Sequence, residues 1–317
     1  MMDNFKAAWW CSNPHCQTIF PTFFRKPVQI ELNEERLITA DNDFLDIAYP
    51  DDNDGDLVLV FHGLEGSLQS HYSRGMLKAL YDTGLYPVFM HFRGCSGEAN
   101  KTTRRYYSAE TSDPTFLLDT FQQRYPERNI YAVGFSLGGN MLLKWLNDLG
   151  EQTPIQKAVA ISVPFDLSIC DKRLQHGLSR IYLKHLLDRL HEGIRLKYDA
   201  GLFPHNYKKA MNSKTFWEFD EYATAPLHGF EGADDYYAKC SSKFYLENVH
   251  TPTLIIQAKD DPFITADALP SKNTFSSAIT LELTDKGGHV GFISGNNPFN
   301  PEYWAEQRTV EFFNNKN

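Results

Sequence analysis

The sequence has little of what would point to a membrane, a secretory pathway or nucleic acid. Its 317 residues contain no apolar run near the roughly 18 residues that a spanning helix needs. The first six residues lack the basic segment and apolar stretch of a signal peptide. The net charge is −9, and the small basic cluster of Lys101, Arg104 and Arg105 is interpreted as a solvated loop. We therefore expect a soluble, cytoplasmic protein with no integral membrane segment and no nucleic-acid partner.

Cysteine is also scarce, and its distribution is irregular. The five cysteines are Cys11, Cys16, Cys95, Cys170 and Cys240. Their number is odd, their spacing is scattered, and no pair has the spacing of a zinc site. This usage predicts free thiols in a reducing compartment. We expect neither a metal nor a cofactor.

Apolar runs that alternate with helical patterns are what the sequence does contain, and 42% of its residues are hydrophobic. Short strands at 28–32, 36–39 and 44–49 predict an antiparallel opening to a sheet. Further strands are expected at 57–61, 86–90, 130–135, 157–163, 253–257 and 278–283. Helices are expected at 70–81, 115–124, 141–149 and 301–313. Such alternation indicates the α/β class, with a mostly parallel sheet covered by helices on both faces.

The pattern changes between Pro164 and His250, where aromatic residues are dense and no apolar strand occurs. We interpret 164–250 as a helical cap inserted over the carboxyl ends of the strands, where ligands bind in such sheets. A helical layer on the flank of the sheet is the alternative. Residues 1–163, with an aromatic-rich arm over 1–27, and 251–317 would form the two parts of the core.

Ser136 lies in the stretch Gly134-Phe135-Ser136-Leu137-Gly138, between a β-branched apolar run and an amphipathic helical pattern. Strand, sharp turn and helix are the context of a nucleophile elbow, which holds a serine oxygen clear of the backbone. Larger residues at Gly134 or Gly138 would collide with the neighbouring strand and helix. The pattern predicts a catalytic serine, with a glycine-rich structural turn as the alternative.

A serine hydroxyl needs a base to accept its proton and a third group to orient that base. His289 follows a late strand through Gly287-Gly288, and we predict that it is the base. Asp261 follows the preceding strand and is the predicted acid, with Asp260 as its rival. The order Ser, Asp, His is that of α/β-hydrolases, and each residue follows a strand, so all three can meet above the sheet.

Stabilisation of an oxyanion requires two preorganised N–H donors. One candidate is the backbone N–H of Leu137, directly after the serine. The other is the N–H of Leu64, in the loop after the strand at 57–61. We interpret His62 as a residue that organises this loop by hydrogen bonding, and His62, His91 and His289 lack the local spacing of metal ligands.

Taken together, the motifs resemble the YheT-like branch of the α/β-hydrolase family. The stretches that carry the resemblance are Asn13–Thr18, His62–Ser67, Phe92–Glu98, the elbow through Asn140, Asp260–Phe263 and Gly287–Phe292. They span nearly the whole chain. The resemblance implies the α/β-hydrolase fold and a serine hydrolase of the carboxylesterase type, with acyl lipids as a plausible substrate class. From the residues alone we derive no chemistry for Asn13–Thr18 beyond a turn capped by Asn13.

The leading hypothesis is an esterase that forms an acyl-Ser136 intermediate with a small-molecule acyl ester. The aromatic-rich insertion would cover a short or medium apolar chain. A thioesterase or an amidase with the same three residues is an alternative. The sequence does not separate these activities from an esterase, because the insertion, and not the three residues, would bind the leaving group. A non-enzymatic binding module of the same fold is the third hypothesis.

Overall fold

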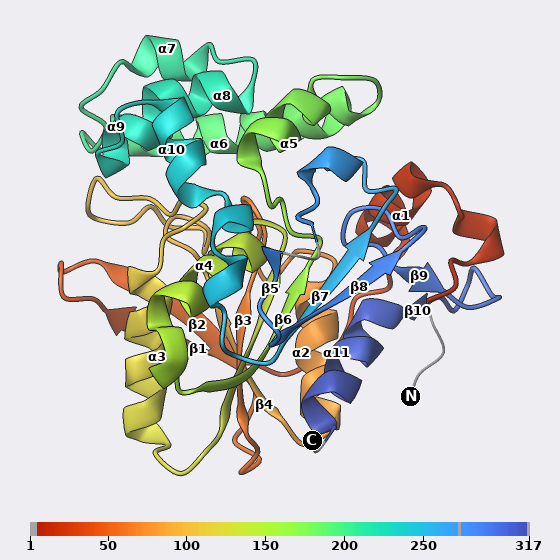
Figure 1. Ribbon diagram of the computed structural model, residues 1–317. Helices are drawn as coiled ribbons and strands as arrows, with labels where there is room; N and C mark the ends of the chain where they lie inside the picture. The colour runs from red at the N-terminus through yellow and green to blue at the C-terminus, as the bar shows by residue number, and fades with distance from the viewer. Residues whose placement is uncertain (1–4, 272–273, 316–317) are drawn as a thin grey trace.

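An eight-stranded sheet forms the centre of the computed structural model, which describes residues 5–271 and 274–315 (Figure 1). Its strands are β1 (Asn33–Ile38), β2 (Phe44–Tyr49), β3 (Leu57–Phe61), β4 (Tyr86–Met90), β5 (Ile130–Phe135), β6 (Ile155–Ile161), β7 (Thr253–Ala258) and β8 (Ile279–Thr284). They lie in the order β1-β2-β4-β3-β5-β6-β7-β8. β2 is antiparallel to both β1 and β4, and all the other neighbours are parallel. The predicted mostly parallel sheet with an antiparallel opening is confirmed.

Helices cover both faces of the sheet, as predicted. They are α2 (Ser73–Asp82), α3 (Ser112–Arg124), α4 (Leu137–Leu149) and α11 (Trp304–Asn314). Phe121 of α3 and Trp145 of α4 belong to the apolar core on one face, whereas Leu77 of α2 and Phe313 of α11 belong to the core on the other. Every residue of β3, β4 and β7 is buried, because these strands have apolar cores on both sides.

The chain between β6 and β7 forms a group of helices beyond one end of the sheet (Figure 1). They are α5 (Leu167–Leu174), α6 (Ser179–Asp199), α7 (Tyr207–Met211), α8 (Phe216–Phe219), the π-helical turn η3 (Asp220–Thr224), α9 (Ala225–His228) and α10 (Ala233–Cys240). Helix α6 buries a stripe of Leu183, Leu187, Leu190 and Ile194, spaced as one helical face requires. This separate apolar cluster also contacts residues of the loops after β3 and β7. The group therefore lies over the carboxyl ends of the strands and not on a flank.

The remaining elements are short or lie near the chain ends. They are helix α1 (Pro14–Phe24), strands β9 (Ile293–Ser294) and β10 (Glu302–Tyr303), and the 3-10 turns η1 (Trp9–Cys11), η2 (Gly150–Gln152), η4 (Ser242–Phe244), η5 (Leu246–Asn248) and η6 (Ala266–Ala268).

The prediction of a strand at 28–32 is wrong. Its apolar–polar alternation arises because Ile30 and Leu32 pack against the core beside α2, while the Ile30 carbonyl accepts a hydrogen bond from Arg74.

The expectation of five free thiols is also wrong, because Cys11 and Cys16 form a disulfide. The turn between η1 and α1 brings their Cα atoms to 5.5 Å, a separation that a disulfide can bridge. Cys95, Cys170 and Cys240 are free. The disulfide removes one reason for predicting that the protein lies in a reducing compartment. In the described part of the chain, no helix is long and apolar enough to cross a membrane, and the cytoplasmic location stays a prediction.

Candidate active site

Ser136 occupies the sharp turn between β5 and α4. Its φ of 50° and ψ of −117° lie outside the regions that residues with a side chain normally adopt. Two glycines make the turn possible, since a Cβ on Gly134 would strike the carbonyl of Gly138, and a Cβ on Gly138 would strike that of His62. The helix begins at the next residue, so its unpaired N–H groups lie beneath the serine.

The loops after β7 and β8 bring an aspartate and a histidine to this serine. His289 Nε2 lies 2.9 Å from Ser136 Oγ, and His289 Nδ1 lies 2.8 Å from Asp261 Oδ2. The Asp261 side chain is fully buried, and its other oxygen accepts a hydrogen bond of 2.8 Å from the N–H of Phe263. The Phe263 ring stacks on the imidazole with 4.0 Å between centroids. With Nδ1–H donating to Asp261, Nε2 is left as the acceptor for the serine proton.

The loop that carries His289 is held from two sides. Asp260 does not contact the imidazole; its Oδ1 accepts a hydrogen bond of 3.0 Å from the N–H of Gly288. On the other side, Thr18 Oγ1 in α1 accepts a hydrogen bond of 3.0 Å from the N–H of His289. A Cβ on Gly288 would lie 2.5 Å from the carbonyl oxygen of Pro14. Helix α1, for which the motif showed no chemistry, thus packs directly against the loop that carries His289.

Asn13 begins this helix, as the predicted turn cap. Its side-chain oxygen accepts hydrogen bonds from the N–H groups of His15 at 2.9 Å and Cys16 at 3.3 Å. The buried Gln17 amide donates to the carbonyls of Cys11 and Ile293, and its oxygen accepts from the Ile293 N–H at 2.6 Å. No spacing in the sequence indicated this link, because its partners lie about 276 residues apart.

The two candidate oxyanion donors, Leu64 and Leu137, both line the cavity that reaches Ser136. Within the described residues, neither backbone N–H donates a hydrogen bond. The loop after β3 passes close to the serine, since a Cβ on Gly63 would lie 3.2 Å from Ser136 Cβ. The arrangement leaves both N–H groups available to an oxygen bound at the serine.

His62 lies beneath this loop and is completely buried. Its Nδ1 donates to the Gly63 carbonyl at 2.7 Å, and its Nε2 accepts from the N–H of Phe92 at 3.0 Å. Burial lowers the pKa of His62 to about 3, so the ring is neutral. His62 therefore connects the loops after β3 and β4. Among the described residues, no three His, Cys, Asp or Glu side chains are grouped as metal ligands would be.

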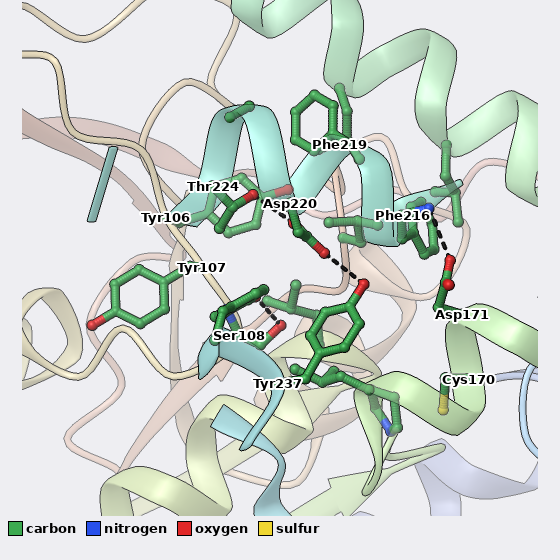
Figure 2. Close-up of a pocket in the computed structure, with 18 of the residues that line it drawn as sticks. Tyr106, Tyr107, Ser108, Cys170, Asp171, Phe216, Phe219, Asp220, Thr224 and Tyr237 are labelled. Carbon is green, nitrogen blue, oxygen red and sulfur yellow. Dashed lines mark hydrogen bonds between the residues drawn. The ribbon is translucent and has the colours of Figure 1, made fainter. Parts of the chain in front are cut away.

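A cavity with about 930 Å³ of unfilled space, its open mouth included, is lined by Ser136 and by residues of the inserted helices. Figure 2 shows part of this lining. Most of its wall is apolar; the lining residues from the insertion include Leu174, Leu186, Leu190, Ile194, Phe216, Phe219, Ala223 and Leu227. Figure 2 shows a polar group in this wall at Asp220, which accepts hydrogen bonds from Thr224 Oγ1 at 2.5 Å and Tyr237 OH at 2.9 Å. Burial raises the pKa of the Asp220 carboxyl to about 7. The sequence carried no signal for this acid.

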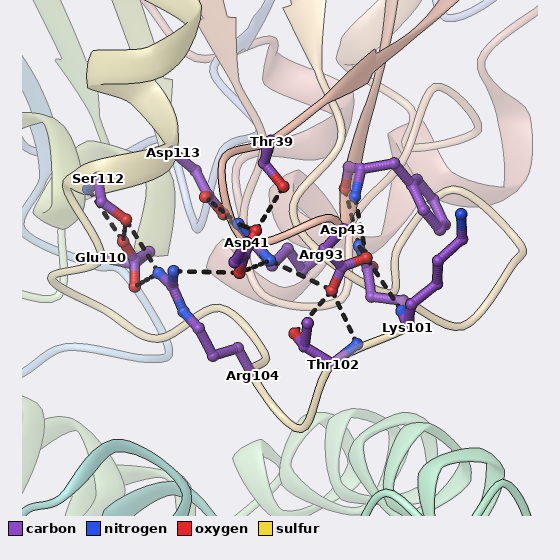
Figure 3. A network of polar contacts seen from close by, with 12 residues as sticks. Thr39, Asp41, Asp43, Arg93, Lys101, Thr102, Arg104, Glu110, Ser112 and Asp113 are labelled. Carbon is purple, nitrogen blue, oxygen red and sulfur yellow. Dashed lines mark hydrogen bonds and ion pairs between the residues drawn. The ribbon is translucent and has the colours of Figure 1, made fainter.

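The loop after β4 is fixed by a buried ionic network (Figure 3). Arg93 is 2% exposed and donates to Asp113 at 2.8 Å, to Asp41 at 2.8 Å and to Asp43 at 3.2 Å. The interpretation of Lys101, Arg104 and Arg105 as a solvated cluster is wrong for Arg105. Arg104 bonds to Glu110 at 2.9 Å, and Arg105 is buried. Arg105 pairs at 2.7 Å with Glu65, a carboxylate 40 residues away in the sequence, whereas the Arg104 side chain stays 35% exposed.

Residues 56–296 match the family described as the alpha/beta hydrolase fold. The chain belongs to this family. It is 40% identical to the YheT protein of Escherichia coli (strain K12), over 95% of this chain and 90% of the relative. The resemblance to the YheT-like branch and the α/β-hydrolase fold predicted from it are confirmed.

More distant members of this alpha/beta hydrolase family also align along most of the chain. Mouse phospholipase ABHD3 is 28% identical over 90% of this chain and 72% of its own length. The medium-chain fatty acid ethyl ester synthase/esterase 2 of Saccharomyces cerevisiae is 30% identical over 81% of this chain and 61% of its own length. The Pyrococcus furiosus esterase Pf2001 has the same fold, with a TM-score of 0.59 and 18% identity over 90% of this chain and 91% of that structure.

Proposed function

We propose that this protein is a serine hydrolase that cleaves carboxylic esters through an acyl-Ser136 intermediate. The observation that carries the proposal is the continuous hydrogen-bonded chain from Ser136 through His289 to Asp261, at the floor of a largely apolar cavity. A serine in this arrangement has a base within reach, and the base has an acid that sets its tautomer.

In the first half of the reaction, His289 Nε2 would take the proton as Ser136 Oγ attacks the carbonyl carbon. Asp261 would stabilise the imidazolium formed. The N–H groups of Leu64 and Leu137 would donate to the oxyanion of the tetrahedral intermediate. His289 then returns the proton to the leaving alkoxide. In the second half, His289 takes a proton from water as the water attacks the acyl carbon, and gives it to Ser136 Oγ as the carboxylic acid leaves.

The walls of the cavity favour an acyl chain as the group bound beside the serine. Apolar side chains from α6, α8 and α9 form part of this surface, and burying a methylene against them contributes about 0.8 kcal/mol. We propose that residues 164–250 act as the cap that binds this chain, between core segments 1–163 and 251–317. Relatives named as a phospholipase and as a medium-chain ethyl ester esterase support acyl lipids as the substrate class.

Labelling with a fluorophosphonate tests the nucleophile. The folded protein is expected to gain one adduct on Ser136, detected by mass spectrometry of its peptides, and to hydrolyse p-nitrophenyl esters. Ser136→Ala should lose both properties. Ser271→Ala, which changes an exposed serine outside the cavity wall, should keep both. Absence of an adduct on Ser136 in folded protein would refute the proposal. A separate comparison of the turnover of esters, acyl-CoA and amide substrates would identify the class of leaving group.

The two neighbouring aspartates provide a second test of the mechanism. Asp261→Asn should lower kcat by about 10³ to 10⁴, because an amide whose oxygen accepts from the Phe263 N–H presents its NH₂ to Nδ1, and the imidazole then takes the wrong tautomer. Asp260→Asn should have a much smaller effect, since its amide oxygen can still accept from Gly288. Steady-state kinetics at several pH values measure both. Equal losses in the two variants would contradict the assigned roles.

A further inference from the structure

Glu65, which follows the candidate oxyanion donor Leu64, has an unusual environment for a loop glutamate. It is 8% exposed, and its φ of 51° places it in the left-handed region, which residues with a side chain rarely occupy. A backbone in that region persists where surrounding contacts hold it there. The contacts of Glu65 are therefore informative about what fixes the loop after β3.

Those contacts come from two consecutive residues of the loop after β4. The N–H of Glu65 donates to Tyr106 OH at 2.7 Å, and Tyr106 OH donates to Glu65 Oε1 at 2.7 Å. Arg105 Nη2 donates to the same carboxylate oxygen at 2.7 Å, with both side chains less than 10% exposed. One tyrosine hydroxyl thus binds both the backbone and the side chain of Glu65, and a buried guanidinium neutralises the carboxylate.

A second tyrosine binds the other side of Leu64. The N–H of Gly63 donates to Tyr72 OH at 2.8 Å, and the Tyr72 ring stacks on Phe135 with 4.2 Å between centroids. The backbone N–H groups before and after Leu64 are therefore both taken by tyrosine hydroxyls. The N–H of Leu64 lies between them and takes part in no hydrogen bond in the described chain, and Leu64 lines the cavity.

The groups that hold Glu65 are themselves rigidly placed. Tyr106 is 6% exposed and stacks on Phe92, with 5.1 Å between centroids and 19° between ring planes. The network of Arg93, Asp43 and Asp113 in Figure 3 fixes the start of the same loop. The Arg105 guanidinium packs on the backbone of α6 at Gly193, where a Cβ would lie 2.6 Å from Nη2.

We propose that Glu65, held by Tyr106 and Arg105, is a positioning residue that aims the Leu64 N–H at the oxyanion of the reacting ester. The inference rests on the proposed serine hydrolase function. A donor aimed at the oxyanion contributes mainly in the transition state, because the carbonyl oxygen of the bound substrate carries less charge and lies elsewhere. Loosening the loop should therefore lower kcat while KM changes little.

Tyr106→Phe is the sharpest test, because it removes one oxygen and keeps the ring that stacks on Phe92. We expect kcat for a p-nitrophenyl ester to fall about tenfold or more, with KM within about twofold of wild type. Affinity for an alkyl trifluoromethyl ketone should fall by a similar factor. In that adduct, the serine oxygen bonds to the carbonyl carbon, His289 takes the proton and the oxyanion occupies the same site. Tyr131→Phe is the matched control, since its hydroxyl contacts Asp56 outside the cavity wall.

The outcomes separate this inference from the function on which it rests. If wild type shows no turnover that depends on Ser136, the proposed function fails. If wild type is active and folded Tyr106→Phe keeps its kcat and inhibitor affinity, or changes KM alone, the positioning role is refuted. Should Tyr106→Phe not fold, Tyr72→Phe and Glu65→Gln decide by the same measurements. Each is expected to lower kcat and inhibitor affinity together, and unchanged values in both would overturn the role.

Discussion

Backbone conformation at a few individual residues shapes the candidate site. Four non-glycine residues around it have positive φ values: Glu65 at 51°, Ser136 at 50°, Val290 at 58° and Phe292 at 44°. Each of these conformations is costly for a residue with a Cβ and needs support from surrounding contacts. The supporting contacts differ, from a tyrosine hydroxyl at Glu65 to the close glycines beside Ser136. At these four positions the surrounding contacts hold a conformation that the residue would otherwise rarely adopt.

Asp220 leads to a prediction about pH at the same scale. Burial raises the pKa of its carboxyl from 3.8 to about 7, against hydrogen bonds from Thr224 and Tyr237 that lower it, and Asp171 raises it further. Between these pH values the unfolded chain releases a proton that the folded chain keeps. The contribution of Asp220 to the free energy of unfolding is therefore fully present below pH 3.8 and is lost as the pH rises through about 7.

Asp220→Asn should remove this pH dependence. The free energy of unfolding of the variant, minus that of wild type, is expected to rise between about pH 4 and pH 7, by at most about 1.4 kcal/mol per pH unit. Urea denaturation at a series of pH values measures the difference, which cancels groups that titrate alike in both proteins. A difference that stays constant across this range would show that Asp220 is ionised throughout.

Among the elements, α1 has the least expected role. It is a short helix near the N-terminus, yet it contacts the loop of His289 through Thr18 and is hydrogen-bonded to β9 through Gln17. The Thr18 hydroxyl also donates to the Pro14 carbonyl at 2.8 Å, so its oxygen is oriented toward the N–H of His289. The helix therefore supports the placement of His289 relative to Ser136.

Thr18→Val keeps the shape of the side chain and removes its oxygen. We expect kcat to fall about tenfold, because the N–H of His289 loses its acceptor and the imidazole is less well placed for proton transfer. Thr18→Ser, which retains a hydroxyl, should stay close to wild type. Steady-state kinetics together with thermal unfolding measure the effect. Full activity in a folded Thr18→Val protein would limit α1 to a structural role.

On the scale of the whole molecule, the cavity exists because the helices between β6 and β7 lie over the carboxyl ends of the strands. Its floor comes from the elbow and the loops after β3, β7 and β8, and much of its wall comes from the insertion. Chemistry and acyl-chain selection should therefore be separable by mutation, since they depend on different parts of the chain.

Leu227→Trp tests that separation. Leu227 lines the cavity and is half-buried, so a larger side chain there should fill space that a long acyl chain needs. Relative to wild type, kcat/KM for p-nitrophenyl esters of long acids should fall about tenfold, while the acetate ester should be hydrolysed normally. Leu196→Trp, at an exposed residue of α6 outside the cavity wall, is the control. Equal losses on long and short esters would contradict a chain-binding role for the cap.

Much of the sheet was predictable from the sequence, because its cues are local. Strands such as 57–61 and 86–90 are apolar at every position and can only be buried on both faces. Ser136, Asp261 and His289 each follow a strand of the same sheet, and parallel strands bring their carboxyl ends to one edge. The alternation of apolar and polar residues at 28–32 led to a wrong prediction of a strand. A segment that packs one side against a core shows the same alternation as a strand paired in a sheet.

Contacts between distant segments decided the rest. The choice between Asp260 and Asp261 depends on a turn that directs one carboxylate to His289 and the other to Gly288. The roles of Thr18 and Glu65 arise from partners supplied by His289 and Tyr106, at separations that no periodicity reports. Local patterns specify which face of an element is buried, whereas the partner of a buried polar group is specified by the fold that brings the two together.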